Sequence, residues 1–420
     1  MAEDIFFQQY IKSLSRLDLP SPPSFEERRS IYVGFWHVFS GKRAVPSFAV
    51  VDGSRFISAF RGGVKAVCSR ALTQVYEGGR LVDDVKEIDV KVGRRLGRPS
   101  LYMRALELRC VKRALEKHPS ISIAICDGDL YPQIHPALAR FSEEEVEAYI
   151  AYLSAFLELY ELAERRGILL IGVSKDSFVN YLRARIITAS ISKEDPGLGQ
   201  RLARERSMRR IVRALASATS QTGVLKHYLS EAEAATSDEE AFDESASEPG
   251  ISRPLILAPQ PIYFGEEIEA GTRSWGVSRI RVRLRQSGLP FSEVTALLDR
   301  IYEMPPAILF YWRPWHGVGV YRVDVSGWGV GVKCKWEEVE GDCFLPDDEV
   351  PACMEIASTL NGLSPEPFAV KPLLDVDGLV RFDRGTFKEC YEPLLIDALR
   401  RAGFKAVLTK RDIRELAVRE

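Results

Sequence analysis

The sequence has few of the residues that hold zinc or form redox centres. Histidine occurs only five times, and no two histidines stand in an HxH or HxxxH array. The seven cysteines are scattered, at positions 68, 110, 126, 334, 343, 353 and 390, and none forms a CxxC pair. This pattern argues against a zinc knuckle or a dithiol centre and favours buried thiols. Any metal ion is therefore expected to have oxygen ligands.

The chain also lacks a long hydrophobic run. The apolar stretches ISIAIC and GILLIGV are about a third as long as the roughly 20 residues that cross a bilayer as a helix. The opening, MAEDIFFQQYIKSLSR, has no basic stretch followed by an apolar segment. We therefore expect no secretion signal, no membrane segment and a cytoplasmic location. GxxxxGKS and GxxxxGKT are absent too, so any energy from nucleotide hydrolysis must come from a partner.

What is present is the composition of a globular protein with a large core. Hydrophobic residues make up 46% of the 420 residues and charged residues 28%, which suits an α/β core with insertions. The formal net charge of −2 conceals a segregation of charge. RARIITASISK and GQRLARERSMRRIVRAL are basic, whereas SEAEAATSDEEAFDESASEPG is acidic. Because affinity for nucleic acid follows the local field, the net charge does not exclude such a partner.

The N-terminal half alternates between strand and helix patterns. Residues 44–60, AVPSFAVVDGSRFISAF, predict two strands joined as a hairpin at Asp-Gly-Ser. Residues 101–117 have the apolar spacing of an amphipathic helix, and residues 142–166 continue from a Ser142–Glu145 capping box as a long helix. ISIAIC and GILLIGV predict buried strands that end in polar residues. This order predicts an α/β fold.

The second half begins with an acidic segment. Residues 230–249 hold mostly Ala, Ser, Glu and Asp, so we expect a mobile insert; the alternative is a solvated helix that caps the basic segment before it. Beyond it, AILFYWR, GVGVYRVDV and GVGVKCKW predict successive antiparallel strands. KECYEPLLIDALRRAG and RDIRELAVRE predict two closing helices.

Three acidic residues form the sharpest candidate site. Asp52 and Asp127 each end an apolar run as Asp-Gly, and Glu107 lies on the helix between them. Carboxylates at the ends of neighbouring strands can share divalent metal ions, which would activate water and stabilise a leaving oxygen. The alternative for each aspartate is turn chemistry alone, and for Glu107 a solvated helix position. The matching surroundings of Asp52 and Asp127 favour the metal site.

These motifs, in this order, resemble those of the NurA nuclease family. The early hairpin motif is VVDGSRF, the helical glutamate lies in ALELRCVKRAL, and the later strand ends in ICDGDL. GVSKDS, with Lys175, is similar to the strand-end lysine motif of the family, and VYRVDV, with Arg322 and Asp324, to its Arg-x-acid strand. The resemblance covers nearly the whole chain. Each motif is short, so only the ordered set is specific.

The resemblance implies a metal-dependent deoxyribonuclease. Its expected cofactor is Mn²⁺ or Mg²⁺, with Asp52, Glu107 and Asp127 as catalytic metal ligands and Lys175 as a further catalytic residue. The implied activities are 5′-to-3′ exonuclease and single-strand endonuclease, used on DNA ends in double-strand break repair. The implied partners are single-stranded and duplex DNA, a second copy in a homodimer, and a HerA-like hexameric helicase or translocase.

The resemblance also implies a fold and its organisation. The expected core is ribonuclease-H-like, with a mixed sheet, helical insertions and an additional antiparallel region. We expect one domain over residues 1–420. Its parts are core strands and helices at about 40–180, a helical basic segment at about 180–228, the acidic insert at about 229–250, and the C-terminal part of the core at about 251–420.

One family motif is altered. Where the family usually has Tyr-Pro-x-Pro-Leu-x-x-Ala-His, this chain has AVKPLLDVD, with Ala369 in place of the tyrosine and Asp377 in place of the histidine. As a fourth carboxylate, Asp377 suits Mg²⁺ or Mn²⁺. The alternative is a catalytically weakened subunit that serves as an adaptor for DNA ends or the helicase. A third hypothesis is an enzyme of the same fold that acts on RNA or hybrids. Asp129 either assists the site or caps a turn.

Further candidates each have two interpretations. Lys175 and Lys410 contact phosphate or are solvated. The cations of residues 201–213 line a DNA channel or balance the acidic insert. The aromatic residues stack unpaired bases or belong to the core; these are Tyr311, Trp312, Trp315 and Tyr321. His316 acts on phosphate or has no role.

Overall fold

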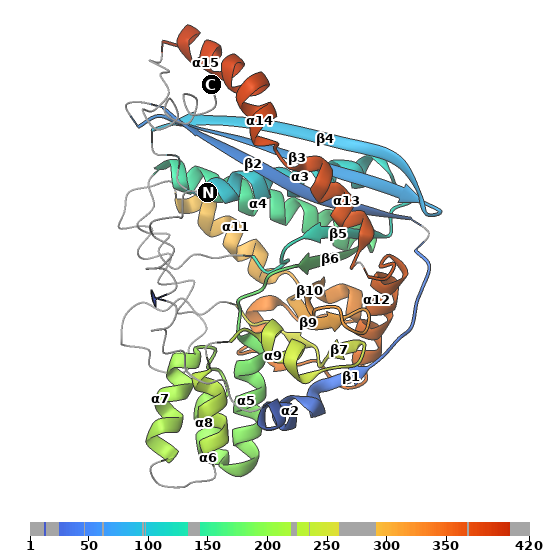
Figure 1. Ribbon diagram of the computed structural model, residues 1–420, viewed down its shortest axis with the longest axis vertical. Coiled ribbons are helices and arrows are strands. Elements are labelled where there is room, and N and C mark those ends of the chain that lie inside the picture. The colour runs from blue at the N-terminus through green and yellow to red at the C-terminus, as the bar shows by residue number, and fades with distance from the viewer. Residues whose placement is uncertain are drawn as a thin grey trace.

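The structure, a computed structural model, describes residues 12–13, 25–45, 47–60, 63–94, 96, 98–132, 143–219, 225–234, 236–259, 291–367 and 369–403. Within these residues an eleven-stranded sheet of mixed direction lies between helices (Figure 1). The strands are β1 Trp36–Val38, β2 Ser47–Ala59, β3 Lys65–Glu77, β4 Arg80–Gly93, β5 Ile123–Asp127, β6 Leu169–Ser174, β7 Gly250–Ser252, β8 Leu255–Ile256, β9 Ala307–Arg313, β10 Tyr321–Ser326 and β11 Cys343–Phe344. The predicted α/β class is confirmed.

Helices fill the connections between these strands. They are α2 Phe25–Tyr32, α3 Pro99–Lys117, α4 Glu143–Arg166, α5 Tyr181–Glu194, α6 Pro196–Leu202, α7 Met208–Thr219, α8 Lys226–Glu233, α9 Asp238–Ser245, α11 Phe291–Glu303, α12 Val350–Gly362, α13 Lys371–Val380, α14 Arg384–Thr386 and α15 Glu392–Arg401. Among the described residues, no helix has both the length and the apolar character needed to cross a bilayer.

The strand order explains where a site can form. The main path of the sheet is β1-β7-β9-β10-β6-β5-β2-β3-β4. The long strands β2, β3 and β4 form an antiparallel meander, and β5 and β6 lie parallel to β2. From β6 onward the pairing is antiparallel through β10, β9 and β7, which is the predicted additional antiparallel region. The arrangement is compatible with a ribonuclease-H-like core.

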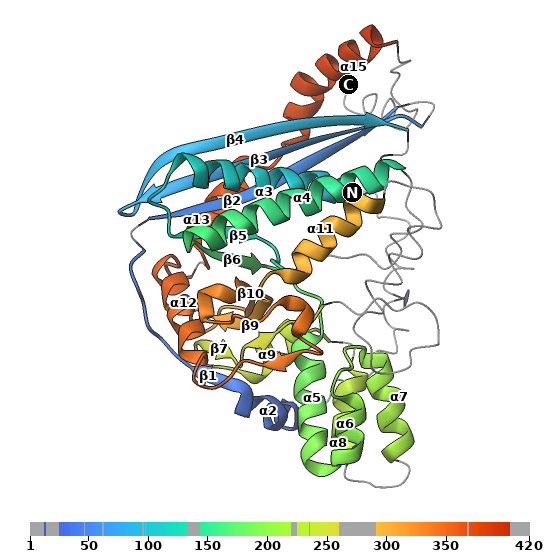
Figure 2. The ribbon, with the colours of Figure 1, turned by 180° about the vertical axis from the view of Figure 1, so that it is seen from behind.

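Two hydrophobic cores lie on opposite faces of the sheet. Side chains alternate along β2, so Ala49 and Val51 join the core under α3 and α4, whereas Phe48 and Val50 join the core under α12 and α13. Figures 1 and 2 show these two helix layers from opposite sides. The alternation places Asp52 on the same face as Phe48 and Val50.

The predicted hairpin at Asp-Gly-Ser is wrong. β2 runs unbroken through this motif and pairs with β3 from Ser47 opposite Glu77 to Ala59 opposite Lys65. An Asp-Gly pair favours a turn locally, but thirteen residues of ladder pairing outweigh that preference. The turn of the hairpin therefore lies beyond Ala59, and Asp52 sits in the middle of a strand.

The predicted mobile acidic insert is also wrong for the residues that the structure describes. Most of that segment forms α8 and α9, and α9 begins with a capping box between Ser237 and Glu240. Phe242 is fully buried, and Asp238 is buried with its carboxylate accepting hydrogen bonds from the backbone amides of Leu182 and Arg183. These contacts tie the acidic segment to the start of α5.

GVGVKCKW is likewise not a strand. After β10 the chain enters a 3-10 helix, Gly327–Val330, and then a second one, Trp336–Glu338, whose Trp336 is buried. The remaining strand and helix predictions within the described residues match β5, β6, β9, β10, α3, α4 and α15. Ser142 of the predicted capping box and the RDIRELAVRE helix lie outside the described residues.

Candidate metal centre

The register of the sheet brings Asp52 and Asp127 together. β2 and β5 are parallel, and the last pair in their register is Val51 with Cys126. Asp52 and Asp127 are the next residue on each strand, so they lie at the point where β5 ends and β2 continues. Neighbours in a parallel register point to the same face of a sheet. The two carboxylates predicted from the sequence are therefore adjacent.

Glu107 reaches the same place from the other face because residue 53 is glycine. A Cβ atom on Gly53 would lie 2.3 Å from Glu107 Oε1 and 2.7 Å from Glu107 Cγ. Glu107 is on α3, which packs against the opposite face of β2, and only 3% of its surface is exposed. Gly53 thus serves close approach of a carboxylate rather than a turn.

The surroundings of Asp52 disfavour its charge. Burial raises the pKa of Asp52 to about 8, and the negative charges of Asp127 and Glu107 contribute next. Its Oδ1 accepts a hydrogen bond of 2.6 Å from the Gly53 amide. Its Oδ2 is buried and has no hydrogen-bond partner within the described part of the chain. The positive charge of Lys175 lowers the pKa of Asp52 less than burial and the neighbouring acids raise it.

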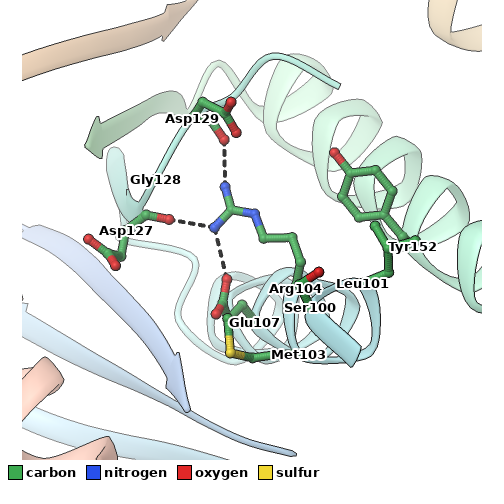
Figure 3. A pocket seen from close by; sticks show the side chains of 9 residues that line it. All are labelled: Ser100, Leu101, Met103, Arg104, Glu107, Asp127, Gly128, Asp129 and Tyr152. Carbon is green, nitrogen blue, oxygen red and sulfur yellow. Dashed lines mark hydrogen bonds and ion pairs between the residues drawn. The ribbon is translucent and has the colours of Figure 1, made fainter. Parts of the chain in front are cut away.

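Arg104 is a member of this cluster that the sequence analysis missed. Its Nη1 donates to Glu107 Oε2 at 2.8 Å and to the carbonyl oxygen of Asp127 at 2.5 Å, and its Nη2 donates to the carbonyl oxygen of Asp129 at 2.6 Å (Figure 3). Burial raises the pKa of Glu107, and the charge of Arg104 opposes that effect. The i, i+3 spacing of Arg104 and Glu107 on α3 was the available signal.

Lys175 lies where the sequence placed it, beside the acids. It follows β6, whose Val173 pairs with Asp127, and its Nζ is 3.4 Å from Asp127 Oδ1. Both side chains remain about one third exposed. Lys175 is therefore a partly solvated cation at the mouth of the acidic cluster.

The VYRVDV motif supports the turn after Asp127. Arg322 and Asp324 on β10 form a buried pair, with Nη2 and Oδ2 2.7 Å apart. Asp324 Oδ2 also accepts from the Leu130 amide, and Arg322 Nη1 is 3.8 Å from Asp129 Oδ2. Asp129 thus faces Arg322, and these contacts hold the turn that follows the acidic cluster.

A cavity of about 240 Å³ opens beside these groups. It is lined by Ser100, Leu101, Met103, Arg104, Glu107, Asp127, Gly128, Asp129 and Tyr152. In Figure 3 the guanidinium of Arg104 lies between α3 and the Asp127–Asp129 turn. Arg104 and Glu107 of α3 and the Asp127–Asp129 turn thus supply its charged groups, while Leu101, Met103 and Tyr152 supply its less polar lining.

The residues present fit a divalent metal ion in their chemistry. Three carboxylates on two strands and a helix provide the oxygen donors that Mg²⁺ and Mn²⁺ prefer, and Asp52 Oδ2 has no other partner among the described residues. Nevertheless, in the ranges that the structure describes, no three Asp, Glu, His or Cys side chains already form a closed ligand set. Arg104 and Lys175 currently neutralise two of the carboxylates. Metal binding would therefore require these side chains to turn.

Asp377, the fourth expected ligand, lies nearby in the fold but is paired elsewhere. α13 packs on β2 and β3, on the face to which Asp52 points. The carboxylate of Asp377 forms an ion pair with Arg381, with Oδ2 and Nη2 2.9 Å apart. Ala369, where the family has tyrosine, is buried. A role of Asp377 in metal binding stays a prediction.

The structure places most of the other candidates outside the site. In the basic segment, Arg206 is buried and binds Asp342, the Tyr131 hydroxyl and the Ala258 carbonyl oxygen. Its guanidinium therefore does not line a solvent channel.

The aromatic and histidine candidates have structural partners. Tyr311 and Trp312 are fully buried, which favours the core interpretation. The Nε2 atom of His316 lies 3.5 Å from Oε2 of Glu248. Lys410 lies outside the described residues.

Comparison with known proteins relates the chain to the NurA family. The family model described as the NurA domain matches residues 46–338. The crystal structure of the NurA nuclease from Sulfolobus solfataricus has 16% sequence identity and a TM-score of 0.48, and the match covers 94% of this chain and 95% of that one. A NurA structure bound to dAMP and manganese has 14% identity and a TM-score of 0.39, with 98% and 99% covered. Among curated proteins, none matches the chain.

Proposed function

The chain belongs to the NurA family of nucleases, and we propose that it hydrolyses DNA phosphodiester bonds with Mn²⁺ or Mg²⁺ held by Asp52, Glu107 and Asp127. The observation that supports this proposal is that Asp52 and Asp127 occupy neighbouring register positions at the end of β5, with Glu107 against Gly53 beside them. A bound divalent ion would supply Lewis acidity and an activated water. It would also favour the charged form of Asp52, whose pKa is raised first by burial and then by the charges of Asp127 and Glu107.

The other residues of the cluster orient the groups that bind. Arg104 holds the Glu107 carboxylate and the Asp127–Asp129 turn in one arrangement. Lys175 is partly exposed and lies beside Asp127, so it is suited to contact a phosphate oxygen of the substrate as a point charge. Asp377 would complete the ligand set only if its ion pair with Arg381 opens.

We further propose the finer activities that the family resemblance implies. These are 5′-to-3′ exonuclease and single-strand endonuclease action on DNA ends, homodimer formation, and work beside a HerA-like hexameric ATPase in break repair. Support for an external motor is the absence of GxxxxGKS and GxxxxGKT from the sequence. Exonuclease action on DNA ends and endonuclease action on single strands are both measurable with purified protein.

A second candidate function is a non-catalytic adaptor for DNA ends or the helicase. Two observations favour it: Ala369 and Asp377 replace the usual tyrosine and histidine, and Asp377 is paired with Arg381. Calorimetry with Mn²⁺ separates the candidates. Binding that is lost in Asp127→Ala supports the enzyme, whereas no binding by the unaltered chain supports the adaptor.

The direct test uses end-labelled DNA with Mn²⁺. Unaltered protein should shorten the DNA, and Asp52→Ala should reduce cleavage to background. Asp347→Ala is the matched control, because Asp347 is an exposed acid paired with Arg253 away from the cluster. Equal degradation by the unaltered chain and Asp52→Ala would remove Asp52 from the mechanism.

A further inference from the structure

Phe178 is a large apolar side chain that the fold leaves in water. It is 83% exposed, the highest value among the exposed large hydrophobic side chains of the described residues. It lies in the short segment between β6 and α5, after the C-terminal end of β6, the strand that pairs with β5 and Asp127. Lys175, on the same segment, is 3.4 Å from Asp127. Phe178 therefore follows, three residues later in the chain, a lysine that contacts the acidic cluster.

The backbone on both sides of Phe178 is held by α9. The amide of Ser177 donates to Glu239 Oε2 at 2.8 Å, and the carbonyl oxygen of Val179 accepts from the Asp238 amide at 2.9 Å. Ser177 itself is buried. Because its two neighbours are fixed, Phe178 is presented to solvent by a specific arrangement of the chain. The acidic segment thus has a structural role next to the site.

The separation from the acids suits a nucleic-acid strand. Three residues of extended chain span at most about 11 Å, so this is the upper limit between the Cα atoms of Lys175 and Phe178. Successive nucleotides of a duplex strand rise by about 3.4 Å. A strand whose phosphate lies at Lys175 would therefore bring a base within the first few nucleotides to Phe178.

We propose that Phe178 stacks on an unpaired base of the DNA strand that enters the acidic cluster, so that the protein prefers frayed or single-stranded ends. This inference rests on the proposed nuclease function. Every base has a flat π face, so an aromatic ring binds single strands with little sequence preference. In an intact duplex those faces are already stacked on neighbouring bases.

The neighbours of Phe178 favour a base over a protein surface. Protein interfaces usually expose a contiguous apolar patch. Around Phe178 the sequence is Lys175, Asp176, Ser177 and then, after Val179, Asn180, and Asp176 is exposed. Lys175 is the cation of this segment that suits a phosphate, whereas Asp176 has the same charge as the DNA backbone, so the attraction has to come from the ring and from Lys175.

The test measures DNA binding by the full chain in an Asp52→Ala background, without cleavage. A single-stranded oligonucleotide carries the fluorescent base 2-aminopurine at successive positions from its end. Phe178→Ala should weaken single-strand binding about 5- to 150-fold, the range expected for loss of one stack, and should abolish the quenching at one position. Phe178→Trp should retain both, and blunt duplex binding should change little.

Two controls make the result decisive. Leu394→Ala removes another strongly exposed apolar side chain, on α15, and should leave binding unchanged. Phe178→Leu keeps an apolar group without a π face and should behave as Phe178→Ala. Unchanged single-strand binding by Phe178→Ala, or full single-strand binding by Phe178→Leu, would overturn the stacking proposal. Failure of the unaltered chain to cleave DNA would instead refute the nuclease proposal, because the binding assay does not depend on cleavage.

Discussion

Replacing Gly53 with alanine tests the geometry of the candidate metal centre with a single methyl group. The new Cβ atom would lie 2.3 Å from Glu107 Oε1, 2.7 Å from Cγ and 2.9 Å from Cδ. Ordinary contacts of this kind require about 3.5 Å, so the Glu107 carboxylate has to retreat by roughly 1 Å. Arg104 holds that carboxylate in place and Glu107 is 3% exposed, so the side chain has little room.

The expected effects on rate and stability differ in size. A displacement of about 1 Å in a group that positions the reaction costs on the order of 100-fold in rate. Overpacking costs roughly 1 to 3 kcal/mol of unfolding free energy, and about 0.4 to 1 kcal/mol is recovered because alanine restricts the unfolded chain. We therefore expect a large loss of Mn²⁺-dependent cleavage with a modest loss of stability.

The assay combines cleavage of a labelled single strand, a Mn²⁺ titration and urea denaturation. Gly34→Ala is the control, because a Cβ atom there meets nothing within 4 Å. In Gly53→Ala combined with Glu107→Asp, the shorter acid makes room for the methyl group, so the two changes should be non-additive. If Gly53→Ala cleaves as fast as the unaltered chain, Glu107 is not positioned through this contact.

Three further changes follow from the buried charges. Arg104→Gln leaves the buried Glu107 unpaired and should lower the unfolding free energy in urea by roughly 3 to 5 kcal/mol; a loss below 1 kcal/mol would contradict this. Arg206→Met should cost a similar amount, because it leaves the buried Asp342 without its ion-pair partner. It should also leave the salt dependence of DNA binding unchanged, whereas loss of a residue that lines a DNA channel would reduce that dependence. Burial raises the pKa of Asp238 to about 6, so its stabilising contribution is complete below the unfolded pKa and is lost as pH rises through 6. From pH 5 to pH 8 the unaltered chain should therefore lose about 1.4 kcal/mol relative to Asp238→Asn, and parallel urea curves at the two pH values would refute it.

The sequence was sufficient for the strands and helices that have their own hydrophobic period. β5, β6, α3 and α4 follow from the apolar spacing alone, and their order is enough to predict an α/β sheet. The same order brought Asp52 and Asp127 to neighbouring strand positions. Local pattern was adequate here because each of these elements buries its own side chains.

Features that depend on distant residues were not predictable in this way. Asp-Gly-Ser continues as β2 because β3 pairs along its whole length. The acidic segment is ordered because Asp238 accepts hydrogen bonds from the first amides of α5. The composition of the segment does not reveal these donors, which lie more than 50 residues earlier in the chain. Arg104 and Phe178 matter through their positions relative to the turn after Asp127 and the loop after β6. A single sequence does not specify such positions.

Charge balance connects the fold to the proposed chemistry. Burying the carboxylates of Asp52 and Glu107 beside the half-buried Asp127 is costly, and the ion pairs of Arg104 and Lys175 are made with Glu107 and Asp127. Burial is the largest cause of the raised pKa of Asp52, and the negative charges of Asp127 and Glu107 add to it. A DNA phosphate would add a further negative charge at Lys175, so these two cations cannot also neutralise the substrate. Under the proposed function, a divalent cation would meet both demands at once, because it would add positive charge beside Asp52 and attract the phosphate.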